Sequence, residues 1–174
     1  GLPVTDYDRV WKDKQDATIR LLTQLPKDDK LIDICKNLKE HGYKIAVASN
    51  SIRNTVKITL MRLGIMDYVD YYQTNEDVKK SKPYPEMYWN CMMALNAIPS
   101  TTLIVEDSHI GRQGAIDSGA KLLAVEDSYD VTWDKVETAI LEMKDKTTKK
   151  NRISFSTIRR CFKNIDENPC VETV

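Results

Sequence analysis

The sequence predicts an α/β fold of three layers, in which helices sandwich a parallel, Rossmann-like sheet. Apolar residues recur alternately at helical spacing and in short runs, and this alternation is typical of parallel strands joined by right-handed helical crossovers. The clearest strand is the apolar run at 102–105, which is followed by the adjacent carboxylates Glu106 and Asp107. Ligands gather at the carboxyl ends of strands in such sheets, so this end of the run is the first candidate for chemistry.

The remaining elements follow from the same patterns. Helices are predicted at 5–25, 28–41, 52–63, 85–95, 111–118 and 132–144, and strands at 43–49, 68–74, 102–105 and 121–125.

The first two helices are marked by their apolar faces and by their ends. Val10 and Leu21 fall on one face of the first helix, and Pro26 closes that segment. Asp28 stands where the N-cap of the second helix belongs, and Gly42 is suited to the position after its last residue. Two separate helices therefore precede the first strand.

The next three elements form one strand–helix–strand unit. The strand at 43–49 is apolar and ends in Ser49. The helix that follows places Val56 and Leu60 on its inner face and is closed by Gly64. A short strand at 68–74 completes the unit.

The second half of the chain repeats this arrangement. Pro85 suits the first turn of a helix whose apolar stripe contains Tyr88 and Cys91. Gly119 closes the short helix that follows the Glu106-Asp107 strand. A last strand and a helix with Val136 on its inner face then follow.

Length and charge indicate one domain with two appendages. The chain has 174 residues, with 26 basic and 26 acidic side chains, so overall charge gives no case for nucleic-acid or membrane-surface binding. Basic residues are concentrated after residue 144. We therefore divide the chain into a helical segment at 1–26, an α/β core at 27–145 and a basic C-terminal extension at 146–174.

The cysteines indicate a reduced environment. Cys35 and Cys91 fall on the apolar faces of predicted helices, and none of the four cysteines has the spacing of a zinc site. The sequence contains no apolar stretch long enough to span a membrane and no signal peptide. A cytoplasmic location is expected.

Polar residues follow three predicted strands at the edge where their carboxyl ends should meet. Ser49 and Asn50 precede a helix, where hydroxyl and amide groups suit a phosphate oxygen. Lys82 precedes Pro83 in a loop stiffened by prolines, where it could neutralise a phosphoryl group. The adjacent carboxylates at 106 and 107 favour a hard cation such as Mg²⁺. Taken singly, each feature is also compatible with helix capping, a solvated lysine or a polar loop.

Together these segments resemble the haloacid dehalogenase (HAD) superfamily. The three matching segments are Lys44-Ile-Ala-Val-Ala-Ser49-Asn50-Ser51, Lys82-Pro-Tyr-Pro-Glu-Met-Tyr88 and Leu103-Ile-Val-Glu106-Asp107-Ser108-His-Ile-Gly111. They look like the second, third and fourth motifs of that superfamily, within which the β-phosphoglucomutase-like phosphatases and mutases are most similar.

The resemblance implies a HAD-like core at 27–145 and a remnant of the family's helical cap at 1–26. It also implies a Mg²⁺-dependent hydrolase, most simply a phosphatase acting on a small phosphorylated metabolite such as a sugar phosphate. By the same comparison, Ser49 and the Asn50 amide would bind the phosphoryl group, and Lys82 would stabilise an aspartyl-phosphate. Asp107, helped by Glu106, would hold Mg²⁺, and Gly111 would permit a tight turn into the next helix.

The first motif of the superfamily, an Asp-x-Asp after a central strand, has no convincing counterpart. The spacing occurs only at Asp6-Tyr7-Asp8, after Leu2-Pro3-Val4-Thr5, which is too short and proline-broken for a central strand. Asp6 is therefore a weak alternative nucleophile. We expect the nucleophilic Asp and its strand to come from an upstream segment or a second chain, and this chain alone to be inactive.

Two other functions remain open from the sequence. The chain could be a phosphate-binding or regulatory module that keeps the fold without the nucleophile. It could also be the C-terminal domain of a larger protein.

Overall fold

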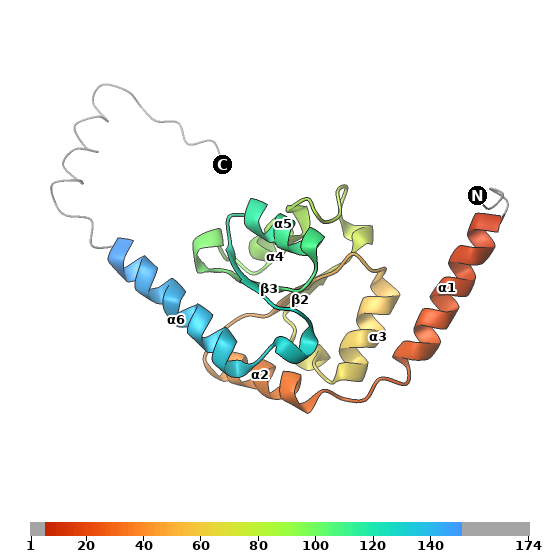
Figure 1. The fold of residues 1–174 in the computed structure, drawn as a ribbon, viewed down its shortest axis with the longest axis horizontal. Helices are drawn as coiled ribbons and strands as arrows, with labels where there is room; N and C mark the ends of the chain where they lie inside the picture. The colour runs from red at the N-terminus through yellow and green to blue at the C-terminus, as the bar shows by residue number, and fades with distance from the viewer. Residues whose placement is uncertain (1–5, 151–174) are drawn as a thin grey trace, which may run out of the picture.

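The alternation of helices and strands predicted from the sequence is present in the computed structural model, which describes residues 6–150. In chain order the elements are α1 (Tyr7–Leu22), α2 (Asp29–Glu40), β1 (Ala46–Ala48), α3 (Arg53–Leu63), β2 (Tyr71–Gln73), α4 (Glu86–Ala94), β3 (Leu103–Glu106), α5 (His109–Asp117), β4 (Lys121–Ala124) and α6 (Trp133–Lys150). Figure 1 shows the strands at the centre of the molecule with helices around them. The predicted α/β class is confirmed.

Local chemistry sets the helix ends as the sequence indicated. The Asp28 side chain caps α2 by accepting a hydrogen bond of 2.9 Å from the Leu31 amide. Gly64 ends α3 in the left-handed conformation, with φ of 79°, which residues other than glycine rarely adopt. These ends fix where the chain leaves each helix for the next strand.

The strands form two separate parallel pairs rather than one continuous sheet. β1 pairs with β2, with Val47 opposite Tyr72, and β3 pairs with β4, with Ile104 opposite Leu122. Within residues 6–150, no backbone pairing joins β1 to β3. The edges of β1 and β3 that face away from their partners therefore lack a neighbouring strand in this part of the chain.

Helices pack on both faces of β1. Val47 joins a core cluster with Val56 and Leu60 of α3, whereas the next residue, Ala48, packs with Tyr88 and Met92 of α4. Successive strand side chains point to opposite faces, so the three predicted layers are present.

The second cluster also joins the two strand pairs. It contains Ile104 of β3 and Ala115 of α5 as well as the α4 residues that pack on Ala48. Side-chain packing therefore connects β1 and β3, although no backbone hydrogen bond does so among the described residues.

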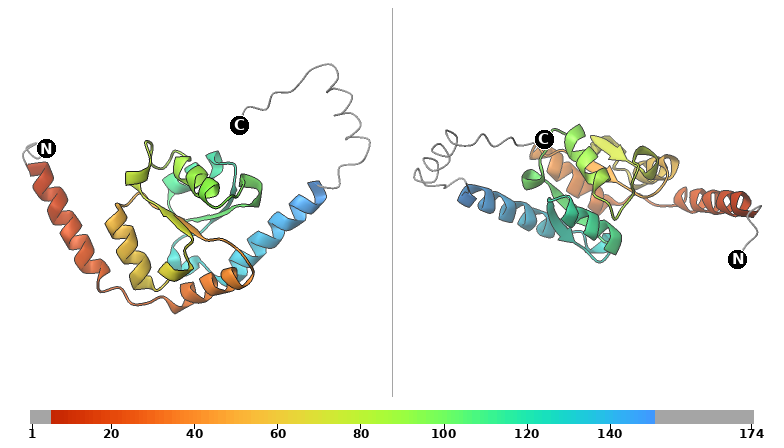
Figure 2. Two further views of the ribbon diagram at one scale, coloured as in Figure 1. Left: turned by 180° about the vertical axis from the view of Figure 1, so that it is seen from behind. Right: turned by 90° about the horizontal axis from the view of Figure 1, so that it is seen from above.

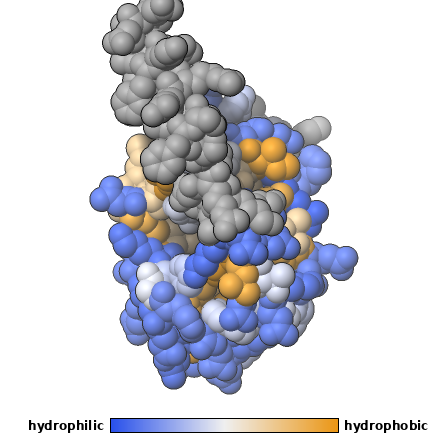
Figure 3. Space-filling model, turned by 90° about the vertical axis from the view of Figure 1, so that its left-hand side faces the viewer, coloured by the Kyte–Doolittle hydropathy of each residue, from blue (hydrophilic) through white to orange (hydrophobic). Residues whose placement is uncertain are grey.

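A large apolar cavity lies between the two strand pairs. Its volume is about 1010 Å³, and both β1 and β3 line it along their full length. Figure 3, which views the left-hand side of Figure 1, shows hydrophobic side chains at the surface on this side of the molecule.

Two helices extend beyond the core. α1 and the C-terminal half of α6 project on opposite sides of the body (Figures 1 and 2). No residue of α1 is buried, and Trp11 is 56% exposed. α6 ends at Lys150, so it crosses the boundary at residue 145 that was predicted from composition. The rest of the basic extension, 151–174, lies outside the described residues.

Two features bear on the expected cellular setting. Cys35 and Cys91 are free and buried, as their positions on apolar helix faces predicted. Cys161 and Cys170 lie outside the described residues. Across the part of the chain that the structure describes, no helix combines the length and apolar character that crossing a membrane requires.

The core makes a direct prediction about stability. Met87 is fully buried in α4, whereas Met93 of the same helix is 68% exposed. Met87→Ala leaves a cavity and should lower the free energy of unfolding by about 2–5 kcal/mol. Urea unfolding measures the change, and Met93→Ala is the matched control, expected to change stability by less than about 0.5 kcal/mol. Equal effects of the two substitutions would contradict the placement of α4.

Candidate functional site

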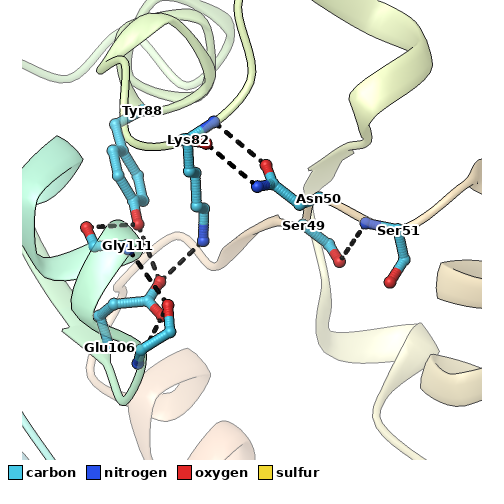
Figure 4. Close-up of polar contacts among 8 residues, drawn as sticks. Ser49, Asn50, Ser51, Lys82, Tyr88, Glu106 and Gly111 are labelled. Carbon is cyan, nitrogen blue, oxygen red and sulfur yellow. Dashed lines mark hydrogen bonds and ion pairs between the residues drawn. The ribbon is translucent and has the colours of Figure 1, made fainter.

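Lys82 connects the carboxyl ends of the two strand pairs. It lies in the loop after β2, and its Nζ is 2.7 Å from Glu106 Oε2 at the end of β3. Figure 4 shows the Lys82 side chain extending toward Glu106. The two side chains are only 8% and 9% exposed, so this is a buried ion pair. Burial makes the pair sensitive to the loss of either partner.

A second contact fixes the backbone of Lys82. Its amide donates to Asn50 Oδ1 at 3.1 Å, and Asn50 Nδ2 donates to the Lys82 carbonyl at 3.3 Å. The peptide bond between Lys82 and Pro83 is cis. Asn50 follows β1, so the ends of β1, β2 and β3 meet here, as the sequence predicted. The Asn50 side chain serves to hold the Lys82 loop.

The Glu106 carboxylate is fully occupied by donors from the protein. Oε2 accepts hydrogen bonds from Lys82 Nζ and from the Tyr88 hydroxyl, the latter at 2.8 Å. Oε1 accepts from the Ser108 amide at 3.1 Å and from the Ser108 hydroxyl at 2.7 Å. A carboxylate has about four lone-pair positions, and these four donors fill them. These contacts hold Glu106 beside Lys82, and its expected part in holding Mg²⁺ stays a prediction.

These contacts determine the charge states at the centre of the site. Burial acts to raise the pKa of the Glu106 carboxyl, but hydrogen bonds from Lys82 and Ser108, with the charge of Lys82, lower that pKa to about 2. Burial, together with the hydrogen bond to Glu106, raises the pKa of the Tyr88 hydroxyl. Glu106 is thus an anion and Tyr88 a neutral donor at neutral pH.

Tyr88 is a site residue that the sequence pattern did not reveal. The pattern assigned it to the apolar stripe of α4, and its ring is indeed buried. Lys82 Nζ lies 5.0 Å from the centre of that ring, and the hydroxyl is within 3.1 Å of the Gly111 carbonyl. A buried tyrosine hydroxyl usually has a polar partner. This rule could have identified Tyr88 as a site residue from the sequence.

Gly111 lies at the entry to α5 and leaves room for Glu106. It is the third residue of the helix, in the first turn, and its amide donates to the Ser108 hydroxyl that caps the helix. A Cβ atom at this position would lie 2.1 Å from Glu106 Cδ and 2.4 Å from each carboxylate oxygen. Glycine is therefore required because the Glu106 carboxylate packs directly against the helix backbone.

The remaining predicted residues differ in their surroundings. Ser49 Oγ accepts a hydrogen bond of 3.2 Å from the Ser51 amide, in the loop that leads to α3. Asp107 directly follows β3 and is exposed. The described residues contain no group of three or more His, Cys, Asp or Glu side chains that could hold a metal ion. Asp107 could therefore be only one of several metal ligands.

Asp6 is not brought to this site. It stands at the N-cap of α1 and lies 3.8 Å from Arg9 in an ion pair on the same helix. α1 projects from the body, with its N-terminal end away from α4 and α5 (Figure 1). Asp6 as an alternative nucleophile is therefore not supported by this arrangement.

The tight contact at Gly111 can be tested by adding one methyl group. Gly111→Ala should force the Glu106 carboxylate away from its donors and lower the free energy of unfolding by about 1–3 kcal/mol. Urea unfolding measures the loss, with Gln113→Ala in the same helix as control, since that side chain is exposed. If Gly111→Ala were as stable as the control, the packing of Glu106 against α5 would be wrong.

The Glu106 carboxylate should also make stability depend on pH. Its pKa in the folded chain, about 2, is below the ordinary 4.5, so it stabilises the fold fully above pH 4.5 and loses this effect as pH falls toward 2. The stability difference between wild type and Glu106→Gln should therefore shrink over that range, as measured by urea unfolding at each pH. A difference independent of pH would contradict the ion pair.

Comparisons with known proteins agree with this fold. The model of the haloacid dehalogenase-like hydrolases matches residues 6–125. The pyrophosphatase PpaX of Bacillus mycoides is 32% identical over 97 residues, which are 56% of this chain and 45% of that protein. The chain thus spans about half the length of the curated relatives that it matches.

Solved structures show the same fold. β-Phosphoglucomutase from Clostridium difficile superimposes with a TM-score of 0.68 at 19% identity, covering 81% of this chain and 70% of that one. A HAD hydrolase of family IA, variant 3, from Entamoeba histolytica gives 0.69 at 18% identity, covering 82% and 73%. With the family match over most of its length, the chain belongs to the haloacid dehalogenase-like hydrolases.

Proposed function

We propose that the protein containing this chain is a Mg²⁺-dependent phosphatase that hydrolyses a small phosphorylated metabolite such as a sugar phosphate. The observation that carries the proposal is the position of Lys82, a buried cation fixed where three strands end. Phosphoryl transfer requires positioning and neutralisation of charge more than any other aid. A lysine held by Glu106 and Asn50 can supply both.

The phosphoryl group is proposed to bind between Lys82 and the loop at 49–51. Nζ of Lys82 has three N–H donors, and Glu106 takes one of them. In the described part of the chain, the Asn50 amide has no hydrogen-bond acceptor, so it is a candidate donor to a phosphate oxygen. The hydroxyl of Ser49 adds another polar group at the same loop.

Asp107 is proposed as the Mg²⁺ ligand that this chain contributes. Its exposed carboxylate is a hard oxygen donor at the end of β3, as Mg²⁺ prefers. When bound, Mg²⁺ neutralises charge on the phosphoryl oxygens. Because Glu106 is saturated by protein donors, the other protein ligands are proposed to lie outside the described residues.

The nucleophile is likewise proposed to lie outside this chain, as an aspartate that forms an aspartyl-phosphate. Lys82 then stabilises the charge of that intermediate. Near Lys82, Glu106 is the carboxylate in direct contact, and its saturated ion pair makes it unsuitable for attack. This chain alone is therefore proposed to bind phosphate without turnover.

The position of Lys82 also supports a second function. If no aspartate joins the site in the cell, the chain is a phosphate-binding or regulatory module with the same fold. The two functions differ in whether the protein that contains this chain turns over a phosphate ester.

The proposal predicts metal-dependent hydrolysis that requires Asp107. The complete gene product should release p-nitrophenol from p-nitrophenyl phosphate only with Mg²⁺, and Asp107→Asn should lower kcat by about a hundredfold or more, in line with loss of a metal ligand. Asp117→Asn, on the exposed end of α5, is the matched control and should retain activity. Undiminished turnover by Asp107→Asn would contradict the assignment.

The 174-residue chain provides the complementary test. It should show no turnover with Mg²⁺, because its described residues supply no nucleophile beside Lys82. Turnover that is lost in Asp6→Asn would instead assign the nucleophile to α1 and overturn the account of the N-terminal segment.

A further inference from the structure

We propose that Tyr88 is a positioning residue, whose hydroxyl acts through Glu106 to direct the Lys82 ammonium group toward the phosphoryl site. The part that Lys82 plays in catalysis rests on the proposed function. The effect of Tyr88 on the orientation of Lys82 can be tested without it.

The Lys82 side chain needs an external constraint to point in one direction. Asn50 holds its backbone, but a flexible stem of four carbons separates that backbone from the ammonium group. The ammonium group donates to Glu106 Oε2 at 2.7 Å. The direction of Lys82 therefore depends on how firmly that one oxygen is held.

The two oxygens of Glu106 are held by different parts of the fold. Oε1 accepts both of its hydrogen bonds from Ser108, which lies two residues further along the chain. Oε2 accepts from Lys82 and, at 2.8 Å, from the Tyr88 hydroxyl. The terminal torsion of a glutamate side chain is broad, so a carboxylate anchored at one oxygen can still pivot about that anchor. Among the described residues, Tyr88 is thus the donor that fixes the oxygen to which Lys82 binds.

The surroundings of Tyr88 make it rigid enough for this role. Its side chain is buried with Met92 and Ile104 in the cluster that joins the two strand pairs. A Cβ atom added at Gly114 of α5 would lie 3.1 Å from Tyr88 Cε2, so the ring fits closely against that helix. The hydroxyl is also within 3.1 Å of the Gly111 carbonyl. Packing therefore fixes the hydroxyl relative to both α4 and α5.

The ring of Tyr88 acts on Lys82 as well. Nζ of Lys82 lies 5.0 Å from the centre of the ring, a distance at which an aromatic face attracts a cation. Figure 4 shows Tyr88 and Glu106 on one side of the Lys82 side chain and Ser49 on the other. The remaining N–H donors of Lys82 are thus directed toward the loop at 49–51, where the phosphoryl group is proposed to bind.

A purely structural role of the hydroxyl is the alternative. A buried hydroxyl needs a polar partner in any case, and its removal would then change stability without changing Lys82. The two roles differ in whether the loss of one oxygen atom from Tyr88 releases the Lys82 side chain.

The first test measures the order of the Lys82 side chain in the 174-residue chain. Tyr88→Phe removes the hydroxyl and keeps the ring. Tyr84→Phe is the matched control, because Tyr84 lies in the same segment, with Lys80 Nζ 4.7 Å from its ring centre, and is 52% exposed. NMR relaxation of the Lys82 Cε group should show a rigid site in the wild type and in the control, and an order parameter below about 0.6 in Tyr88→Phe.

The second test measures turnover of p-nitrophenyl phosphate by the complete gene product. Tyr88→Phe should lower kcat by about tenfold to a hundredfold and change KM by less than about twofold, because a misdirected Lys82 neutralises less charge in the transition state. Tyr84→Phe should leave both constants unchanged.

The outcomes separate this proposal from the proposed function. Equal order of Lys82 in Tyr88→Phe and Tyr84→Phe would assign the hydroxyl a structural role and overturn the proposal. A flexible Lys82 in the wild-type chain, which requires no variant, or an unchanged kcat in Tyr88→Phe would overturn it as well. Loss of order in Tyr88→Phe without any turnover by the wild-type gene product would support the control of Lys82 by Tyr88 and count against the phosphatase.

Discussion

The buried ion pair between Lys82 and Glu106 joins two strand pairs that share no backbone hydrogen bond within residues 6–150. One partner comes from the loop after β2 and the other from the end of β3, so the pair determines how the carboxyl edges of β1–β2 and β3–β4 meet. Neighbouring residues hold this ion pair in place. Asn50 fixes the Lys82 backbone, and Tyr88 and Ser108 donate hydrogen bonds to Glu106. Gly111 leaves room for the Glu106 carboxylate. Losing one partner of a buried pair leaves an unpaired charge, which costs about 3–5 kcal/mol.

At two neighbouring places in the fold, polar groups lack partners among the described residues. Between β1 and β3, backbone groups face an apolar cavity, and at the carboxyl end of that cavity Asp107 is a lone exposed carboxylate. The chain spans about half the length of the curated relatives that it matches.

Much of this arrangement was predictable from the sequence because it depends on local patterns. Strand and helix periodicity located the elements, and the rule that parallel strands share a carboxyl edge brought Asn50, Lys82 and Glu106 together. The roles of Glu106 and Gly111 were not predictable in this way, since they depend on Tyr88 and on α5 packing against the end of β3. Nor does periodicity show which strand edges pair, so the separation of the sheet between β1 and β3 required the structure.

The most direct measurement of the central claim is amide hydrogen exchange in the 174-residue chain, resolved by residue with NMR. The backbone amides of Val47 and Ile104 face β2 and β4, whereas those of Ala48 and Val105 face the cavity. The account predicts slow exchange for the first pair and fast exchange for the second, an alternation within each strand. Slow exchange at all four positions would show that the inner edges are already paired and would contradict the account.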